Sequence, residues 1–574
     1  MLGKQGTHRS NRGGTAMFED VRDVGTSDAF DPDRFRSIFG DRPAIMTAVQ
    51  SAHVPSPEAA PDADSPVGPE ATPTLPDEPI DDGEIHWAAG ARDGVFTHMF
   101  AAADDTADHT QSIRAMLDRV ALERRTDDLR TLYAYVLEHG VLSIADALTD
   151  SFSNIPPRDP DAYAHLARAL IRNSPDREPV KLGITLLGHF GNHADHADLL
   201  TIGAHDEFTL FALVALANLG VDDAPWLLAP KVHGWGRIHC IERLDAPVDD
   251  PARRRWLLAH GWRNTIMTEY TAAICARRGG LDEALANTSI EHPDHDTILD
   301  AAANILAALC RSGGPGEDFR ACHKCVPCSQ RLFNLVEQHP SPKLDWYISL
   351  RDIASFAQRV QSFPPKDAGA ARDLGWTPQA CRALIKTLER IAQQPIWPTR
   401  LRAALDAPHF AHTEQAFRIA ADIAPDFTID PFDARFARTA HGEDHWYWLA
   451  RTPDRERFER VLDLARASID LAAIATGPAD CSGFGPAFAP HRTLDWILQE
   501  LRNWPGLGED FIRAGLMSPV VRNRIGAARV LLALDAPARQ PFIVDVAKAR
   551  ALDPDEAAAE LLERVLVGER ETAE

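Results

Sequence analysis

The sequence has 574 residues, with 60 Lys and Arg against 84 Asp and Glu, which gives a formal net charge of −24. At about 150 residues per domain this length corresponds to three or four domains or to one elongated array, and a hydrophobic content of 45% excludes a mostly disordered chain. The acidic balance argues against nucleic-acid binding, which needs a positive field over the binding face. The sequence contains no apolar run of about 18 residues, the length that a membrane-spanning helix needs.

The first predicted region is an acidic, proline-rich arm over residues 1–84. No Lys or Arg occurs from Pro43 to Ala91, whereas this stretch contains nine Asp or Glu residues and repeated prolines. Because like charges repel and proline lacks a backbone N–H, the stretch cannot bury enough apolar surface to offset the entropy lost on ordering. We therefore expect a disordered arm. The weak helical spacing within Phe30 to Val49 leaves a short docking helix as the alternative.

Amphipathic helices are predicted from residue 85 to the C-terminus, with residues 85–178 as an N-terminal helical capping region. The three- and four-residue spacing of a helix buried along one stripe is shown by Leu129, Leu132, Tyr133, Val136 and Leu137. Thr377 and Thr452 each precede a proline, as an N-cap does before proline at the first helical position. Strand-type alternation is nearly absent, so we predict an all-α fold.

Degenerate helix pairs recur at a spacing of about 30 to 40 residues. The strings GVDDAPWLL (Gly220 to Leu228) and VDDPARRRWLL (Val248 to Leu258) are similar in sequence, and the string GEDF begins at Gly316 and again at Gly508. A pair of this length cannot bury its apolar stripe alone, so neighbouring pairs stack around a continuous core. The repeats therefore predict a right-handed superhelical α-solenoid with a concave inner surface.

One C-terminal string resembles the inner helix of a HEAT-type repeat. In that helix an Arg near the start precedes small residues that allow close packing. The match lies in SPVVRNRIGAARVLLAL, where Val521-Arg522 is followed by Ala527-Ala528.

The strings HGWGRIHCIERL and GWRNTIMTEY, between His233 and Tyr270, are similar to HEAT-like, armadillo-type proteins of an uncharacterised bacterial family. This resemblance implies a HEAT-like repeat array over residues 179–340. It also implies helical repeats over residues 341–574 that end in a HEAT-like unit. It implies no activity.

A cluster of Arg, Trp and polar residues marks the predicted partner-binding surface, because Arg and Trp dominate the energetics of protein interfaces. The predicted binding residues on the inner helices are Trp235, Arg237, His239, Glu242, Trp262, Arg263, Asn264 and Glu269. The alternative is structural: an Arg–Glu ladder that links adjacent repeats, with both tryptophans packed between helices.

A long loop from Gly477 to Pro490 supplies two further candidates, Phe484 and Phe488. The loop is rich in Gly, Pro and Phe and interrupts an otherwise compact helical array, as binding loops often do. Phe484 and Phe488 are therefore predicted to bind a partner. The alternative is that they anchor the loop to the core.

The clearest candidate for metal chemistry is the run Cys322-His323-Lys324-Cys325-Val326-Pro327-Cys328, which contains two consecutive C-x2-C spacings. Closely spaced thiolates can share a zinc ion or an iron–sulfur cluster, and the fourth ligand of a zinc ion could be His323 or a remote Cys240, Cys275 or Cys310. Pro327 disfavours helix at Val326, so we expect the run to lie in a turn between helices. The alternative is that these small residues pack a helix junction. Eight Cys in the whole chain are too few for a disulfide scaffold, which fits the reducing cytoplasm.

The sequence thus predicts a non-enzymatic cytoplasmic scaffold or adaptor that holds a protein or peptide on its concave face. The alternative is a metal- or redox-responsive protein that uses Cys322, Cys325 and Cys328. A third hypothesis is a helical-repeat enzyme of unknown reaction, such as a DNA-repair enzyme, although the net charge of −24 disfavours DNA. The sequence contains no P-loop and no G-x-S-x-G nucleophile motif. It leaves the oligomeric state open.

Overall fold

The computed structural model describes residues 37–52, 74–78, 87–99, 106–244, 248–311, 316–407, 412–423 and 430–569. Within these ranges the chain forms helices and turns without a β-strand, apart from an isolated bridge between Cys481 and Val520. The predicted all-α class is therefore confirmed for the described residues. None of their helices combines the length and apolar character that crossing a membrane requires.

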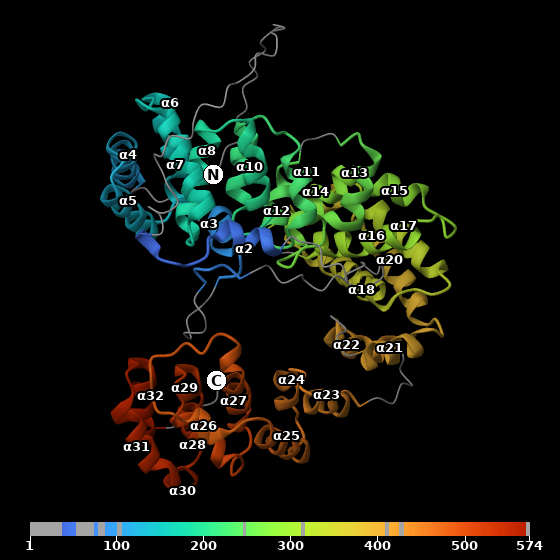
Figure 1. Cartoon of the computed structure of the whole chain (residues 1–574). Helices are drawn as coiled ribbons and strands as arrows, with labels where there is room; N and C mark the ends of the chain where they lie inside the picture. The colour runs from blue at the N-terminus through green and yellow to red at the C-terminus, as the bar shows by residue number, and fades with distance from the viewer. Residues whose placement is uncertain are drawn as a thin grey trace. The chain divides into compact units, whose positions relative to one another are not determined.

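The helices belong to two compact units, whose boundary lies between Ile396 and Trp397 (Figure 1). The N-terminal unit contains α2 (Ile45–Ala52), α3 (Ala91–Met99), α4 (Thr106–Glu123), α5 (Thr126–His139), α6 (Ala145–Asn154), α7 (Pro160–Asn173), α8 (Arg177–Phe190), α9 (His196–Ile202), α10 (Thr209–Asn218), α11 (Ala224–Leu228), α12 (Trp235–Glu242), α13 (Pro251–Trp256), α14 (Glu269–Gly279), α15 (Leu281–Asn287), α16 (His295–Cys310), α17 (Cys325–Gln338), α18 (Leu344–Arg359), α19 (Pro365–Asp373) and α20 (Pro378–Ala392). The C-terminal unit contains α21 (Trp397–Asp406), α22 (Thr413–Ile423), α23 (Pro431–Ala440), α24 (Trp446–Ala450), α25 (Arg455–Ser468), α26 (Leu471–Ile474), α27 (Ala489–Leu501), α28 (Glu509–Leu516), α29 (Val521–Ala533), α30 (Ala536–Arg539), α31 (Ile543–Leu552) and α32 (Glu556–Leu566).

In the N-terminal unit one row of helices follows the chain, and each member packs against the next. The row consists of α7, α8, α10, α12, α14, α16, α18 and α20 (Figure 1). The intervening helices α9, α11, α13, α15 and α17 pack beside this row. The C-terminal unit contains a similar succession of α24, α27, α29 and α32, with α28 beside α27 and α29. Each row member therefore buries its apolar face against its neighbours, as stacked helix pairs require.

This packing places the unit boundary differently from the predicted domains. The predicted boundary between residues 178 and 179 falls inside α8, and the boundary between residues 340 and 341 falls between α17 and α18. Because α18 packs against both α16 and α20, the row continues without interruption past residue 340. Both predicted boundaries therefore lie within the N-terminal unit.

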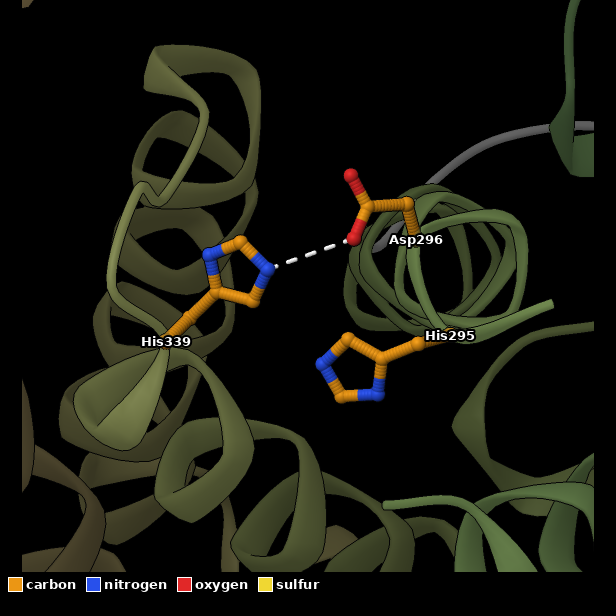
Figure 2. A group of neighbouring side chains, drawn as sticks. All are labelled: His295, Asp296 and His339. Carbon is orange, nitrogen blue, oxygen red and sulfur yellow. Dashed lines mark hydrogen bonds and ion pairs between the residues drawn. The ribbon is translucent and has the colours of Figure 1, made fainter. Parts of the chain in front are cut away.

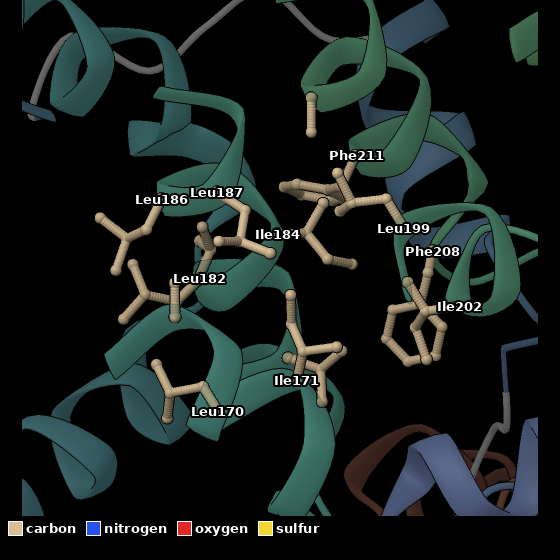
Figure 3. Close-up of a cluster of buried hydrophobic side chains, with 14 of the residues drawn as sticks. Leu170, Ile171, Leu182, Ile184, Leu186, Leu187, Leu199, Ile202, Phe208 and Phe211 are labelled. Carbon is tan, nitrogen blue, oxygen red and sulfur yellow. The ribbon is translucent and has the colours of Figure 1, made fainter. Parts of the chain in front are cut away.

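The core around α8 shows why the row is tightly packed. Its centre is formed by Leu170, Ile171, Leu182, Ile184, Leu186, Leu187, Leu199, Ile202, Phe208 and Phe211 (Figure 3). Helix α8 is apolar on most of its circumference because α7 and α10 cover it from two sides. At Gly183 a Cβ atom would lie 2.9 Å from the carbonyl oxygen of Ala167, so only glycine permits this approach of α7.

The prediction of a disordered arm is wrong for residues 37–52 and 74–78. Helix α2 packs against α7 and α9, where Ile45 and Val49 are fully buried, and Leu75 is also buried. These apolar residues interrupt the acidic, proline-rich sequence and bury enough surface to dock the segment. The average composition of the arm did not reveal them. The docking-helix alternative is therefore correct in part, since α2 overlaps only the end of the segment Phe30 to Val49 for which it was made. Residues 1–36, 53–73 and 79–84 of the predicted arm lie outside the described residues.

Ion pairs add to this docking. The guanidinium of Arg42 donates two hydrogen bonds of 2.8 Å to the carboxylate of Asp176, which also accepts a 2.7 Å hydrogen bond from the hydroxyl of Tyr133. Asp77 accepts hydrogen bonds from the backbone N–H of Arg177 at 2.8 Å and from its guanidinium at 3.0 Å. The described parts of the arm are thus tied to the N-terminus of α8.

Deletion of residues 1–82 is expected to destabilise the N-terminal unit, because it removes Ile45, Val49 and Leu75 from the core together with the Arg42 ion pair. Burial of each such apolar side chain contributes about 1.5–3 kcal/mol, so we expect a fall in Tm of about 4 °C or more. Differential scanning calorimetry checks this result. Deletion of residues 1–36 alone, which removes none of these contacts, is the control, and an unchanged Tm in the longer deletion would contradict the docking of the arm.

A buried ion cluster links α3 to α8 and to the turn before α10. Lys181 is 1% exposed, and its Nζ lies 2.6 Å from the carboxylate of Asp93, 2.7 Å from that of Glu207 and 3.2 Å from that of Glu178. Glu207 also accepts a 2.7 Å hydrogen bond from the N–H of Gly90. Burial raises the pKa of Asp93. Burial alone would raise the pKa of Glu207 as well, but the nearby positive charges, that of Lys181 first, hold it below its ordinary value.

Candidate functional site

The partner-binding residues predicted from the sequence come together around α12 and α14, but most of them are interior. The buried members are Trp235, Arg237, His239, Trp262 and Glu269. Glu242 and Asn264 are half-buried, and Arg263 is exposed. Partner binding by these residues stays a prediction. The buried members could contribute to it only by positioning the more exposed residues.

Arg237 shows what the buried members of this cluster do. Its guanidinium donates hydrogen bonds to the carbonyl oxygens of Val232 at 2.8 Å, His260 at 2.9 Å and Arg263 at 3.2 Å. It also lies over the ring of Trp256, 5.4 Å from the centroid. Burial lowers the pKa of Arg237. Arg237 therefore has the structural role given above as the alternative. Its partners are backbone carbonyls and not a glutamate of an Arg–Glu ladder.

The loop residues Phe484 and Phe488 differ in exposure. Phe484 is 48% exposed, whereas Phe488 is half-buried and packs against His491 with ring centroids 5.5 Å apart. Backbone hydrogen bonds fix the loop at Gly477 and Cys481, which contact the segment that leads into α29. Phe488 therefore has an anchoring contact, and Phe484 remains available to a partner.

The cysteine run lies only partly in a turn: Cys322 to Lys324 precede α17, and His323 and Lys324 form a turn, whereas the rest of the run is helical. Helix α17 begins at Cys325, and Pro327 occupies its first turn, where the missing N–H of proline costs no intrahelical hydrogen bond. Cys325 and Cys328 are buried, Cys322 is half-buried and His323 is exposed.

The environment of these thiols favours their protonated form. A hydrogen bond to Cys325, together with burial, raises the pKa of Cys322. A hydrogen bond to Cys310 is the main cause of the raised pKa of Cys325, and burial raises the pKa of Cys328 to about 12. The structure thus brings Cys310 from α16 next to Cys325, in addition to Cys322 from the run itself. Metal binding by Cys322, Cys325, Cys328 and His323 stays a prediction.

A different group fits the spacing of metal ligands within the described residues. One potential ligand atom from each of His295, Asp296 and His339 lies within 4.8 Å of the other two, and no other His, Cys, Asp or Glu set in the described ranges meets this criterion (Figure 2). His295 and Asp296 open α16, and His339 directly follows α17. The His-Asp pair is visible in the sequence, but the approach of His339 depends on the packing of α17 against α16.

A second candidate is a surface hollow of about 450 Å³ in the C-terminal unit, which we term the arginine hollow. It is lined by Arg451, Asp495, Leu498, Gln499, Glu500, Arg502, Arg522, Ile525, Gly526, Arg529 and Val530. These residues come from α27, α29 and the end of α24. Four arginines against two acids give the lining an excess of positive charge in a chain that is acidic overall.

Two of the four arginines are already paired. Arg522 donates a 2.7 Å hydrogen bond to the carboxylate of Asp495. Arg451 lies 3.4 Å from the carboxylate of Glu500 and stacks over the ring of Tyr447, 3.7 Å from its centroid. These contacts hold the two guanidinium groups in place and neutralise much of their charge.

Arg502 and Arg529 have no ion-pair or hydrogen-bond partner among the described residues, and both side chains are exposed. Arg502 directly follows α27, and Arg529 lies on the exposed face of α29. Beneath them, Gly526 allows α29 to approach α27, since a Cβ atom there would lie 3.3 Å from the Cβ of Leu498. The hollow is thus lined by polar and apolar residues together, and two of its guanidinium groups are free to bind an anion.

Sequence reasoning did not identify this hollow. The seven-residue spacing of Arg522 and Arg529 on one helix was the available signal, because residues seven apart lie on the same face. Arg451 and Arg502 join them through tertiary packing.

Comparison with protein-family models, with curated proteins and with solved structures finds no match to this chain. Its function is therefore inferred from its own residues.

Proposed function

We propose that the protein is a non-enzymatic HEAT-like scaffold whose C-terminal unit binds an acidic segment of a protein partner in the arginine hollow. The observation that carries this proposal is the pair of exposed arginines, Arg502 and Arg529, which line the hollow and have no partner among the described residues. The sequence-based expectation of a protein-binding scaffold is retained, and its binding surface is moved from the helices around Trp235 to α27 and α29.

The succession of helices supports the repeat architecture in this proposal. Each row member contacts the next member and the helices beside it, so that the core is extended by addition of pairs. In a HEAT-like superhelix the row helices would line the inner surface. The arginine hollow lies on such a row, between α27 and α29.

The charge of the hollow favours a carboxylate-bearing peptide. A guanidinium group binds a carboxylate through two parallel N–H···O hydrogen bonds, which gives orientation as well as affinity. Tyr447 and Trp496, which Arg451 contacts, add aromatic surface beside the hollow. A nucleic-acid duplex would need a positive field over a larger area, against a net charge of −24.

The test is the binding of a fluorescein-labelled, Asp- and Glu-rich peptide to the full-length protein, followed by fluorescence anisotropy. The variant combines Arg502→Glu with Arg529→Glu. We expect it to weaken binding about tenfold or more, because each reversal replaces an attraction by a repulsion, and we expect added salt to weaken binding to the wild type.

The matched control combines Arg455→Glu with Lys548→Glu, which changes the net charge equally at exposed sites outside the hollow. We expect this control to bind within about twofold of the wild type. Equal loss of binding in both variants would show a general charge effect and contradict the proposed site. Tighter binding of a duplex oligonucleotide than of the peptide would contradict a protein partner.

A further inference from the structure

We infer that His295, Asp296 and His339 form a binding site for a divalent transition-metal ion, with Zn²⁺ as the best-matched ion. This site belongs to the N-terminal unit and does not depend on the proposed binding of an acidic peptide. Two imidazoles and one carboxylate are ligands that Zn²⁺ uses commonly, and three protein ligands leave a position open for water.

The geometry brings the three ligands together from two helices. The Nε2 atom of His339 lies 3.2 Å from a carboxylate oxygen of Asp296 (Figure 2). The rings of His295 and His339 are stacked, with centroids 5.4 Å apart and an interplanar angle of 4°. One ligand atom of each residue lies within 4.8 Å of the others, so a small ion needs modest side-chain rotation to contact all three.

His295 is the observation that points most directly to a ligand. The residue is 4% exposed, and neither ring nitrogen has a partner at normal hydrogen-bond geometry. A buried polar group without a partner costs about 1–3 kcal/mol, and most such groups in proteins are satisfied. A bound metal ion would satisfy one of these nitrogens.

Metal binding would change the hydrogen bonds that His339 makes. Its Nδ1 accepts a 3.1 Å hydrogen bond from the N–H of Ser341, so Nε2 carries the proton and donates it to Asp296. Coordination through Nε2 moves that proton to Nδ1 and releases the Ser341 hydrogen bond. The metal therefore replaces two hydrogen bonds by bonds to His339 and Asp296, with no net proton release.

Neighbouring groups support the orientation of His339. Trp346 packs edge-on against its ring, with centroids 5.0 Å apart. The indole N–H of Trp346 donates a 2.6 Å hydrogen bond to Asp300, which also accepts one of 3.0 Å from Lys343. Such outer contacts fix ligand orientation in metal sites. Asp296, with a side chain 55% exposed, leaves the site open to solvent on its side.

The site is distinct from the cysteine run. His339 follows the last residue of α17, whereas Cys325 is the first residue of that helix. The 14 residues of α17 span about 21 Å, so one ion cannot bind at both ends. Separate substitutions can therefore distinguish the two sites.

The experiment measures zinc in tag-free, full-length protein that has been stripped with chelator and dialysed against a buffer that fixes free Zn²⁺. Bound zinc is determined by plasma mass spectrometry. We expect about one zinc ion per chain in the wild type. Loss of an outer contact alone weakens metal sites about 10–100-fold, so we expect Asp296→Asn and His295→Gln to weaken affinity by about 100-fold. Because Asp296 is exposed, its variant retains the fold even where the His295 variant does not.

Two controls separate this site from the cysteine run: His323→Gln and Cys322→Ser, both of which should leave zinc binding unchanged. The Co²⁺-loaded protein should show visible d–d bands without a thiolate charge-transfer band. Loss of zinc in Cys322→Ser with retention in Asp296→Asn would overturn the inference. Failure of the wild type to bind stoichiometric zinc, or unchanged affinity in Asp296→Asn, would overturn it as well.

Discussion

Replacement of Arg524 by alanine is expected to destabilise the C-terminal unit by about 3–5 kcal/mol, the cost of leaving one partner of a buried ion pair alone. The side chains of Arg524 and Asp553 are both 0% exposed and are joined by two hydrogen bonds of 2.7 Å. Arg524 also donates to the carbonyl oxygens of Ala479, Ser518 and Pro519 at 2.8–2.9 Å. The substitution therefore leaves a buried carboxylate and three carbonyls without their donor.

Native-state hydrogen exchange of the α29 amides reports this loss for the C-terminal unit alone, without assuming that both units unfold together. Arg522→Ala is the matched control. Arg522 is exposed and pairs with Asp495, so we expect its loss to cost about 1 kcal/mol or less. Equal effects of the two substitutions would contradict the structural role assigned to the Arg524–Asp553 pair.

Replacement of Lys181 by alanine should destabilise the N-terminal unit to a similar extent, about 3–5 kcal/mol. Three carboxylates, those of Asp93, Glu178 and Glu207, lie within 3.2 Å of its ammonium group, and the side chains of Asp93 and Glu207 are only 5% exposed. Without the lysine, burial disfavours their charged forms and they repel one another.

Urea unfolding and hydrogen exchange at α3 and α8 measure this effect, which we expect to be largest at α3 because the cluster holds that helix in place. Arg172→Ala, at an exposed pair with Asp198, is the control and should change stability by less than about 1 kcal/mol. Stability equal to that of the wild type in the Lys181 variant would show that the cluster contributes nothing to folding.

The buried arginine of α29 shows how far a sequence motif determines structure. The HEAT-type match placed the motif arginine at Arg522, but the buried guanidinium is that of Arg524. The helix begins at Val521, and its contacts with α27 and α32 turn Arg524 inward and Arg522 toward solvent. The helix was predictable from its periodicity, whereas its rotation about its own axis depends on neighbours distant in the sequence.

Helix starts were predictable where the capping residue had no competitor. The hydroxyl of Thr377 caps α20 by accepting a hydrogen bond from the N–H of Ala380 at 3.2 Å, as predicted. Thr452 was also predicted to be an N-cap, but Asp454 caps α25 instead, through the N–H of Arg457 at 2.9 Å. Asp is a stronger cap than Thr, and it displaces the helix start by two residues.

The candidate sites were less accessible to sequence reasoning because their members converge from separate helices. Trp235 and Arg237 are of the types that favour interfaces, yet packing turns them into the interior. The reverse holds for Arg502 and Arg529, which carry no local motif but meet at one hollow. Burial and convergence are properties of helix packing, which local patterns do not encode.

Hydrogen exchange of the full-length protein with and without the acidic peptide tests the proposed binding function most directly. We predict slower exchange of amides in α27 and α29 when the peptide is bound, and no such protection in the protein that carries Arg502→Glu and Arg529→Glu. Protection confined to other helices, or its absence at saturating peptide, would contradict the assignment of the arginine hollow as the binding site.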